Sequence, residues 1–211
     1  MNPHKGQPVL RGGAPVPGAR VALVLVHGRG ASADDIYSLG EEIAAGIPGV
    51  ALLAPQAAGS TWYPQRFLFP VEQNEPYLGS ALSVIGGLVE EVVSGGVALE
   101  RVVLVGFSQG ACLSLEFASR NPRRYGGIMG LSGALIGTPG GPRLLRKGLD
   151  GTPVYLGCSD RDAHIPLASV EESATVLAGQ GAAVTKSIFP GMGHIVNGEE
   201  LGFMHQLVRT L

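Results

Sequence analysis

The chain has 211 residues, of which 15% are charged, and its net charge is -2 at pH 7. This length fits a single α/β domain over residues 1–211 with a well-filled core, and it leaves nothing over for a second domain or a large lid. So small a net charge gives no electrostatic reason to expect nucleic acid or an anionic membrane as a partner. We therefore expect neither a nucleic-acid-binding protein nor a stable membrane association.

The N-terminal ten residues contain Pro3 and Pro8 but no apolar stretch ahead of a cleavage site, so no signal peptide is expected. No run approaches the length of a membrane span. The two cysteines, Cys112 and Cys158, fall on a predicted core helix and at a strand end, where buried reduced thiols are the expected state. These features predict a cytoplasmic protein.

Strand and helix patterns alternate along the whole chain. Apolar and β-branched runs predict strands over residues 7–11, 21–26, 50–54, 102–105, 127–131, 154–157 and 183–189. Helical patterns cover residues 32–46, 76–94, 111–118, 166–178 and 198–210, with Ser32 and Asp35 as a capping box and Asn74 as a cap for the second helix. This alternation predicts a mostly parallel sheet with helices on both faces, whose ligands bind at the carboxyl ends of the strands.

The most informative motif follows the strand 102–105. Gly106-Phe107-Ser108-Gln109-Gly110 fits G-x-S-x-G and leads at once into a helical stretch. In such a turn a serine is held at a strained backbone position between strand and helix, and the flanking glycines lack the Cβ atoms that would clash. We therefore interpret Ser108 as a nucleophile. The alternative is a glycine-rich turn with an idle serine.

Two later loops supply a carboxylate and a histidine in the chain order Ser, Asp, His. His194 follows the strand 183–189 and would accept the proton of Ser108, while an aspartate orients its ring. Spacing leaves the choice between Asp160 and Asp162 open. The remaining histidines are poorer candidates for the base: His4 in a frayed terminus, His27 in a structural role, His164 in the acid's own loop and His205 on the last helix.

An acyl-transfer site also needs two backbone donors for the oxyanion. We expect one from Gln109, directly after the nucleophile, and one from Arg29, in the loop after strand 21–26. The same loop also fits a dinucleotide pattern through Gly28, Gly30 and Ala33. That alternative is disfavoured because no acidic residue follows the next strand, where a ribose would need one.

Several spaced motifs together resemble the phospholipase/carboxylesterase family of small α/β hydrolases, which includes acyl-protein thioesterases. The motifs are HGRGASADD, PQAAGSTWYP, GFSQGA, DAHIP and GMGH, and they cover nearly the whole chain. The resemblance implies the α/β-hydrolase fold without a separate lid domain, Asp162 as the acid of the triad, and oxyanion amides at Arg29 and Gln109. The chain departs from the family at Arg29, where thioesterases usually have an apolar residue, and at Ala163, where many members have proline. It looks closer to the bacterial esterases.

Aromatic residues cluster in the long segment between residues 55 and 74, and they are either a pocket wall or a satellite core beneath the loop. For substrate contacts we choose Trp62 first, because the family places this segment near its active site, and then Phe67, Leu135, Met192 and His164. A pocket without a lid domain would be shallow and open, which favours short or medium acyl groups.

The sequence thus predicts a serine hydrolase of carboxylic esters that works through an acyl-enzyme, with a small-molecule ester as substrate and with neither a cofactor nor a metal. The alternatives are an acyl thioesterase or lysophospholipase and, in another class, a ligand-binding receptor with vestigial hydrolysis. Whether the chain forms a homodimer stays open.

Overall fold

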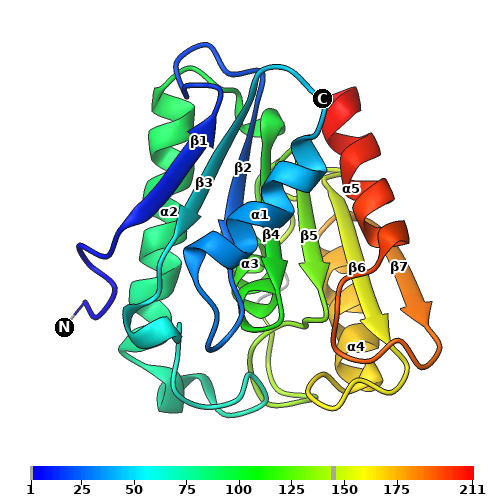
Figure 1. Ribbon diagram of the computed structural model, residues 1–211. Helices are drawn as coiled ribbons and strands as arrows, with labels where there is room; N and C mark the ends of the chain where they lie inside the picture. Colours follow the sequence, from blue (N-terminus) through cyan, green and yellow to red (C-terminus); the bar gives the residue numbers. More distant parts are fainter. Residues whose placement is uncertain (1, 144–145) are drawn as a thin grey trace.

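The structure is a computed structural model that describes residues 2–143 and 146–211. Its strands and helices follow the predicted alternation (Figure 1). The strands are β1 (Val9–Gly13), β2 (Val21–Val26), β3 (Val50–Pro55), β4 (Val102–Phe107), β5 (Gly127–Leu131), β6 (Pro153–Ser159) and β7 (Ala183–Phe189). The α-helices are α1 (Ala33–Ala44), α2 (Tyr77–Ser94), α3 (Gln109–Arg120), α4 (Leu167–Gly179) and α5 (Gly198–Thr210). Short 3-10 turns cover Ala58–Ser60, Val71–Asn74 and Leu99–Arg101.

Within the described residues, the strands form one seven-stranded sheet in the order β1-β3-β2-β4-β5-β6-β7. Strand β1 pairs antiparallel with β3, and the other neighbours pair in parallel. Every residue of β2 and β3 is buried, because a parallel strand covered on both faces has no solvent-exposed side. The parallel strands point toward the lower edge of Figure 1, so their carboxyl ends meet there.

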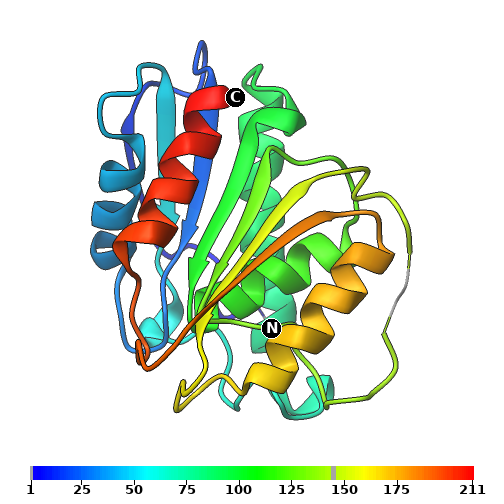
Figure 2. The same cartoon turned by 90° about the vertical axis from the view of Figure 1, so that its right-hand side faces the viewer.

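Helices cover both faces of the sheet, as the sequence predicts (Figure 2). Helices α1 and α5 contact each other on one face, and α2, α3 and α4 lie on the other. Each face has its own apolar core, one around Leu23, Leu25 and Ile43 and the other around Ile85, Leu104 and Leu113. The expected α/β-hydrolase architecture, a mostly parallel sheet between two helical layers, is confirmed.

Two sequence expectations concerning α2 are wrong. Asn74 does not cap this helix: it is buried, and its Oδ1 accepts the backbone N–H of Gln65 at 2.8 Å, while the N-cap position is Pro76. In addition, α2 is long and apolar enough, by length and composition alone, to cross a membrane. Leu78, Ala81 and Ile85 on this helix are buried in the core, so α2 serves here as a packed helix of the sheet layer.

Helix α5 begins with a capping box that contains a buried carboxyl group. The Asn197 side chain accepts the backbone N–H groups of Glu199 and Glu200, and Glu200 Oε2 accepts the N–H of Asn197 at 2.9 Å. Glu200 has no exposed surface, and a Cβ on Gly157 of β6 would lie 2.0 Å from its Oε1. Burial raises the pKa of Glu200 from 4.5 to about 7.

We expect Glu200→Gln to stabilise the protein at pH 8 and to have little effect at pH 5. The raised pKa means that the stability contributed by the protonated carboxyl is present below 4.5 and is lost as pH rises through about 7. Glutamine keeps the cap acceptor without the buried charge, so the free energy of unfolding at pH 8 should rise by roughly 1 kcal/mol or more. Urea unfolding at both pH values measures this, with the exposed neighbour Glu199→Gln as control. An equal gain at both pH values would contradict the assignment.

Candidate active site

Strand β4 ends in the turn that carries Ser108. Ser108 has φ 55° and ψ -117°, a left-handed conformation that L-residues rarely adopt. The turn is tight enough to exclude side chains on both sides: a Cβ on Gly106 would lie 2.3 Å from the carbonyl oxygen of Gly110, and one on Gly110 would lie 1.9 Å from that of Val26. Both glycines are therefore required for the turn, which holds the Ser108 hydroxyl at the start of α3.

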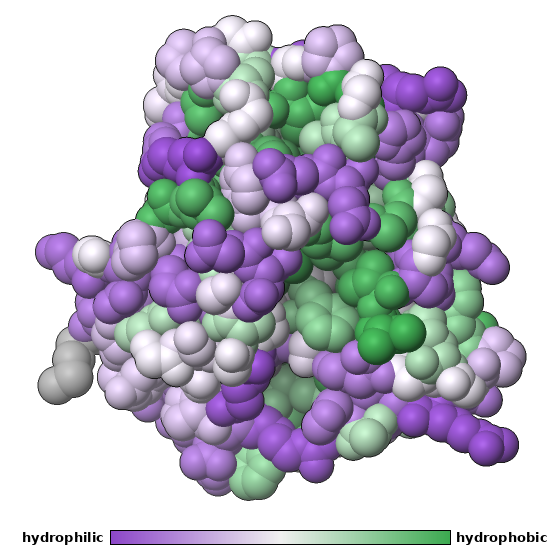
Figure 3. Space-filling view, in the orientation of Figure 1, coloured by the Kyte–Doolittle hydropathy of each residue, from purple (hydrophilic) through white to green (hydrophobic). Residues whose placement is uncertain are grey.

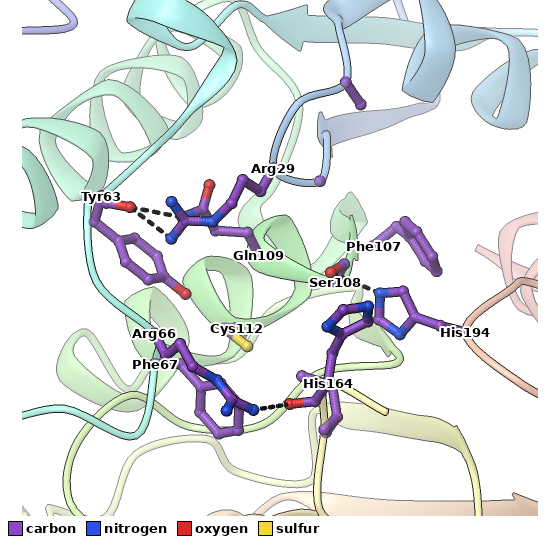
Figure 4. Close-up of a pocket in the computed structure, with 13 residues that line it drawn as sticks. Arg29, Tyr63, Arg66, Phe67, Phe107, Ser108, Gln109, Cys112, His164 and His194 are labelled. Carbon is purple, nitrogen blue, oxygen red and sulfur yellow. Dashed lines mark hydrogen bonds between the residues drawn. The ribbon is translucent and has the colours of Figure 1, made fainter. Parts of the chain in front are cut away.

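The structure brings Ser108, His194 and Asp162 together although they are far apart in the chain. The Ser108 Oγ lies 2.8 Å from His194 Nε2, and His194 Nδ1 lies 2.7 Å from Asp162 Oδ2. Figure 4 shows the His194 ring directed at Ser108. With Nδ1–H donating to the carboxylate, Nε2 is free to accept the serine proton. This is the hydrogen-bond arrangement that activates a serine nucleophile.

The carboxylate of Asp162 is fully buried and held on both oxygens. Oδ1 accepts the backbone N–H groups of His164 at 2.8 Å and Ile165 at 3.0 Å, while Oδ2 faces His194. Burial would by itself raise the pKa of Asp162, but the hydrogen bonds from His194 and the two backbone groups hold the pKa below its usual value. Asp162 is therefore ionised at neutral pH.

The other aspartate of this loop does not reach the histidine. Asp160 Oδ1 accepts the backbone N–H of Gly191 at 2.8 Å, which ties the β6 loop to the loop that carries His194. The His194 ring packs instead between two aromatic neighbours, Phe107 at 5.0 Å and His164 at 4.8 Å between ring centroids. Of the two aspartates that spacing left open, only Asp162 contacts the base.

A cavity of about 300 Å³ opens over Ser108 and His194 (Figure 4). Phe67 and His164 line it, as the sequence predicts. Side chains that the sequence analysis did not assign to the pocket complete its wall: Tyr63, Arg66, Phe107, Cys112 and Ile165. Cys112 lies four residues after Ser108 on α3, so the helical period alone points to it. The thiols of Cys112 and Cys158 are free and buried, and burial raises the pKa of each to about 12.

Three residues expected at the substrate do not line this cavity. Trp62 belongs to the segment 56–76, the pocket loop that connects β3 to α2, and it has no exposed surface. Leu135 is buried, with its backbone N–H bonded to Ser173 Oγ at 2.9 Å. Met192 is half-buried, and its Sδ accepts a hydrogen bond from the side-chain N–H of Asn197 at 2.8 Å. The Met192 side chain therefore contacts the start of α5. Contrary to what the sequence leads us to expect, Trp62, Leu135 and Met192 are not part of the wall of this cavity.

Trp62 instead belongs to a buried polar network that supports the pocket loop. Its ring packs between His4 and His27, at 5.3 Å and 5.0 Å between centroids, and its Nε1–H donates to the carbonyl oxygen of His27 at 2.9 Å. Trp62, His4 and His27 are buried, so their polar groups depend on these internal bonds, which hold the loop in place.

The two histidines of this network are neutral and carry their protons on opposite nitrogens. His4 accepts the N–H of Ala58 on Nδ1 and donates from Nε2 to Trp62 O at 2.8 Å. His27 accepts the N–H of Ala57 on Nε2 and donates from Nδ1 to Gly28 O at 2.7 Å. Burial lowers the pKa of both rings. The expected structural role of His27 agrees with these bonds, whereas His4 is not in a frayed terminus. His205 is half-buried and contacts Ile43 O.

The two residues expected to supply oxyanion donors both line the cavity. In the part of the chain that the structure describes, the backbone N–H groups of Arg29 and Gln109 donate to no protein atom. Their side chains hold the pocket loop: Gln109 accepts the N–H of Trp62 and donates to Tyr63 O, and Arg29 donates to Tyr63 O, Pro64 O and Gln65 O. Among the described residues, Arg29 and Gln109 thus each offer an unpaired backbone N–H at the cavity and a side chain that holds the pocket loop.

A smaller, mostly apolar cavity of about 180 Å³ adjoins the first. It shares Gly28, Ala31 and Phe107 with it and extends to Leu39 of α1 and Val196, between α1 and the loop before α5. Figure 3 shows hydrophobic side chains near the middle of the face that carries α1 and α5, among hydrophilic ones. The residues around Ser108 therefore offer two subsites of different character.

Comparisons with known proteins agree with this architecture. A family model described as phospholipase/carboxylesterase matches residues 14–211. A phospholipase/carboxylesterase from Dyadobacter fermentans has a similar solved structure, with a TM-score of 0.89, 38% sequence identity and 96% of each chain covered.

Among curated proteins, acyl-protein thioesterase 1 of Gibberella zeae is 33% identical over 142 residues, which are 65% of this chain and 60% of the relative. Lysophospholipase-like protein 1 of Mus musculus is 28% identical over 134 residues, which are 63% of this chain and 56% of the relative. The matches thus span little more than half of these relatives' length. The family model covers nearly all of the chain and confirms the resemblance of its motifs. The chain belongs to the phospholipase/carboxylesterase family.

Proposed function

We propose that this protein is a serine hydrolase that cleaves carboxylic esters of small molecules through an acyl-enzyme. One observation carries the proposal: the unbroken chain of hydrogen bonds from Ser108 through His194 to the buried carboxylate of Asp162. A pure ligand-binding receptor has no need of this relay, which disfavours that alternative. We also propose that the chain acts as a single domain in the cytoplasm, without a cofactor.

In the proposed reaction, Ser108 Oγ attacks the ester carbonyl carbon and its proton passes to His194 Nε2. Asp162 holds the ring orientation and stabilises the imidazolium. The backbone N–H groups of Arg29 and Gln109 bind the oxyanion. The imidazolium then returns the proton to the departing alcohol, and water, activated by His194, releases the acyl group and restores the serine.

The experiment that tests this proposal is covalent labelling with a fluorophosphonate, followed by peptide mapping with mass spectrometry. We expect modification at Ser108, abolished when His194 is replaced by alanine, because the hydroxyl needs its base. Labelling at another serine, or equal labelling without His194, would contradict the proposed mechanism.

A thioester is the second candidate for the bond cleaved, because several relatives are acyl-protein thioesterases. Relative kcat/KM on oxygen esters and thioesters with the same acyl chain separates the two. Cavities of about 300 and 180 Å³ favour short or medium acyl chains over long ones. A lysophospholipase would have to accept a long acyl chain, so kcat/KM as a function of acyl length tests that alternative.

We expect Gln109→Ala to keep considerable activity, with kcat/KM lowered by about tenfold or less, because the proposed oxyanion donor at this position is a backbone N–H. The lost side chain leaves Trp62 N–H without its acceptor and removes one of the two donors to Tyr63 O, which keeps its bond from Arg29. Stability should therefore fall by about 1–3 kcal/mol. Kinetics on an aryl ester and urea unfolding measure both effects. Collapse of turnover in a folded variant would instead indicate a catalytic role for the side chain.

A further inference from the structure

The cavity over Ser108 carries positive charge. Arg29 and Arg66 both line it, with His164 and the base His194, and no aspartate or glutamate is among the lining residues. The whole chain is slightly acidic, with a net charge of -2, so the presence of two arginines at this cavity does not follow from composition. In a partly enclosed cavity, unpaired charges attract opposite charge more strongly than on a flat surface.

Neither guanidinium is neutralised by a carboxylate. In residues 2–143 and 146–211, neither Arg29 nor Arg66 forms an ion pair. Arg29 uses three N–H groups on backbone carbonyls of the pocket loop, so its position is fixed but its charge remains. These carbonyl contacts hold one positive charge at the cavity wall independently of any ligand.

The guanidinium of Arg66 has N–H groups that are available to a ligand. Its Nη2 donates to the carbonyl oxygen of His164 at 3.0 Å, and this is the one hydrogen bond of its guanidinium in residues 2–143 and 146–211. Figure 4 shows this bond crossing from the pocket loop to the loop that carries Asp162. The remaining N–H groups of a guanidinium form a planar fork that fits a carboxylate or phosphate with two parallel hydrogen bonds. Arg66 is exposed, and its bond to His164 holds it at the cavity wall.

We propose that the substrates are esters that carry a carboxylate or similar anionic group close to the scissile bond, and that Arg66 binds this group, with Arg29 adding its charge. The inference rests on the proposed function and names the substrate class for the same site. The uncharged part of the substrate would lie in the adjoining, mostly apolar cavity beside Leu39 and Val196, whose one acidic lining residue, among those described, is Asp35. The anionic group can belong to the acyl part or to the alcohol part of the ester, and it would bind Arg66 in the same way in both cases.

The test compares charged and neutral esters in two pairs. The acyl-side pair is the 4-nitrophenyl monoester of glutaric acid and 4-nitrophenyl hexanoate. The alcohol-side pair is 4-carboxyphenyl butyrate and 4-carbamoylphenyl butyrate. In at least one pair we expect kcat/KM to be about tenfold higher for the charged ester, equivalent to about 1.4 kcal/mol. The pair that shows the preference identifies the side that carries the anion.

The preference should depend on Arg66 and on salt. We expect the charged-to-neutral ratio to fall toward one in Arg66→Gln, to be partly kept in Arg66→Lys, and to fall as sodium chloride is raised, because salt screens exposed charges. Arg66 is exposed, so these variants should fold. The matched control is Arg101→Gln, an exposed arginine in the turn before β4, at the other end of that strand from Ser108. Its ratio should equal that of the unchanged protein.

The inference is overturned if, in both pairs, kcat/KM for the charged ester is equal to or lower than kcat/KM for the neutral ester. It is also overturned if a preference for the charged ester remains in Arg66→Gln. Failure of the proposed function gives a different result. If Ser108→Ala abolishes hydrolysis of the neutral esters while the charged esters show no advantage, the serine hydrolase stands and only the anion site is wrong. If no ester is hydrolysed at all, the proposed function itself fails.

Discussion

Replacing Ser108 with alanine lowers kcat/KM on an aryl ester by at least about 10³-fold in our expectation. The change removes the attacking oxygen while the other two members of the relay and the backbone donors remain. Residual turnover then reflects water attack assisted by His194 and by the oxyanion donors. The same variant should lose fluorophosphonate labelling, and steady-state kinetics with intact-mass analysis measure both effects.

The control for this change is Ser114→Ala. Ser114 is buried on the same helix, α3, and its Oγ has no hydrogen-bond partner in the described part of the chain. Alanine should therefore preserve both the fold and the activity at this position. If Ser108→Ala kept most of its activity while labelling occurred elsewhere, the nucleophile would have been assigned wrongly.

The turn around Ser108 could be predicted because its sequence signals are local. An apolar strand, two glycines and a helix follow one another between residues 102 and 120. A Cβ on Gly106 would meet Gly110 in the same turn, whereas one on Gly110 would meet Val26 and His27 at the end of β2, so the need for this second glycine arises from a contact distant in the sequence. The signals of the Ser32 and Asp35 capping box are local too, and the structure contains it as predicted. Parallel strands could be predicted as well, because a strand buried on both faces is apolar throughout.

The pocket wall could not be predicted in the same way. The place of Trp62 in the pocket loop makes it a reasonable candidate for the wall, but in the structure it packs against His4, which is 58 residues away in the sequence. No local pattern indicates that an N-terminal histidine packs against that ring. Arg66 lacks a local signal too: its place in the cavity follows from a bond to His164, 98 residues away. Long-range polar contacts between loops leave no periodicity in the sequence.

Asp162→Asn gives the second large effect that we expect, a loss in kcat of about 10³- to 10⁴-fold near neutral pH. The direction follows from the contacts of the carboxylate. Oδ1 accepts N–H groups from His164 and Ile165, so the oxygen of an asparagine would keep that side. Its amide nitrogen would then face His194 Nδ1, which could no longer donate there. The proton would move to Nε2, and a ring protonated on Nε2 cannot accept one from Ser108.

Asp160→Asn is the matched comparison, two residues away in the same loop. In the described part of the chain, the one hydrogen bond of the Asp160 side chain is from the backbone N–H of Gly191, and an asparagine oxygen accepts the same bond. Its effect on kcat should therefore be about tenfold or less, with the KM of the aryl ester little changed. Stopped-flow or steady-state measurements on both variants decide between the two carboxylates. Asp162 contacts Nδ1 of His194, the nitrogen that faces away from Ser108, and so holds the proton there. A larger loss of kcat from Asp160→Asn than from Asp162→Asn would therefore contradict this arrangement of the hydrogen-bonded relay.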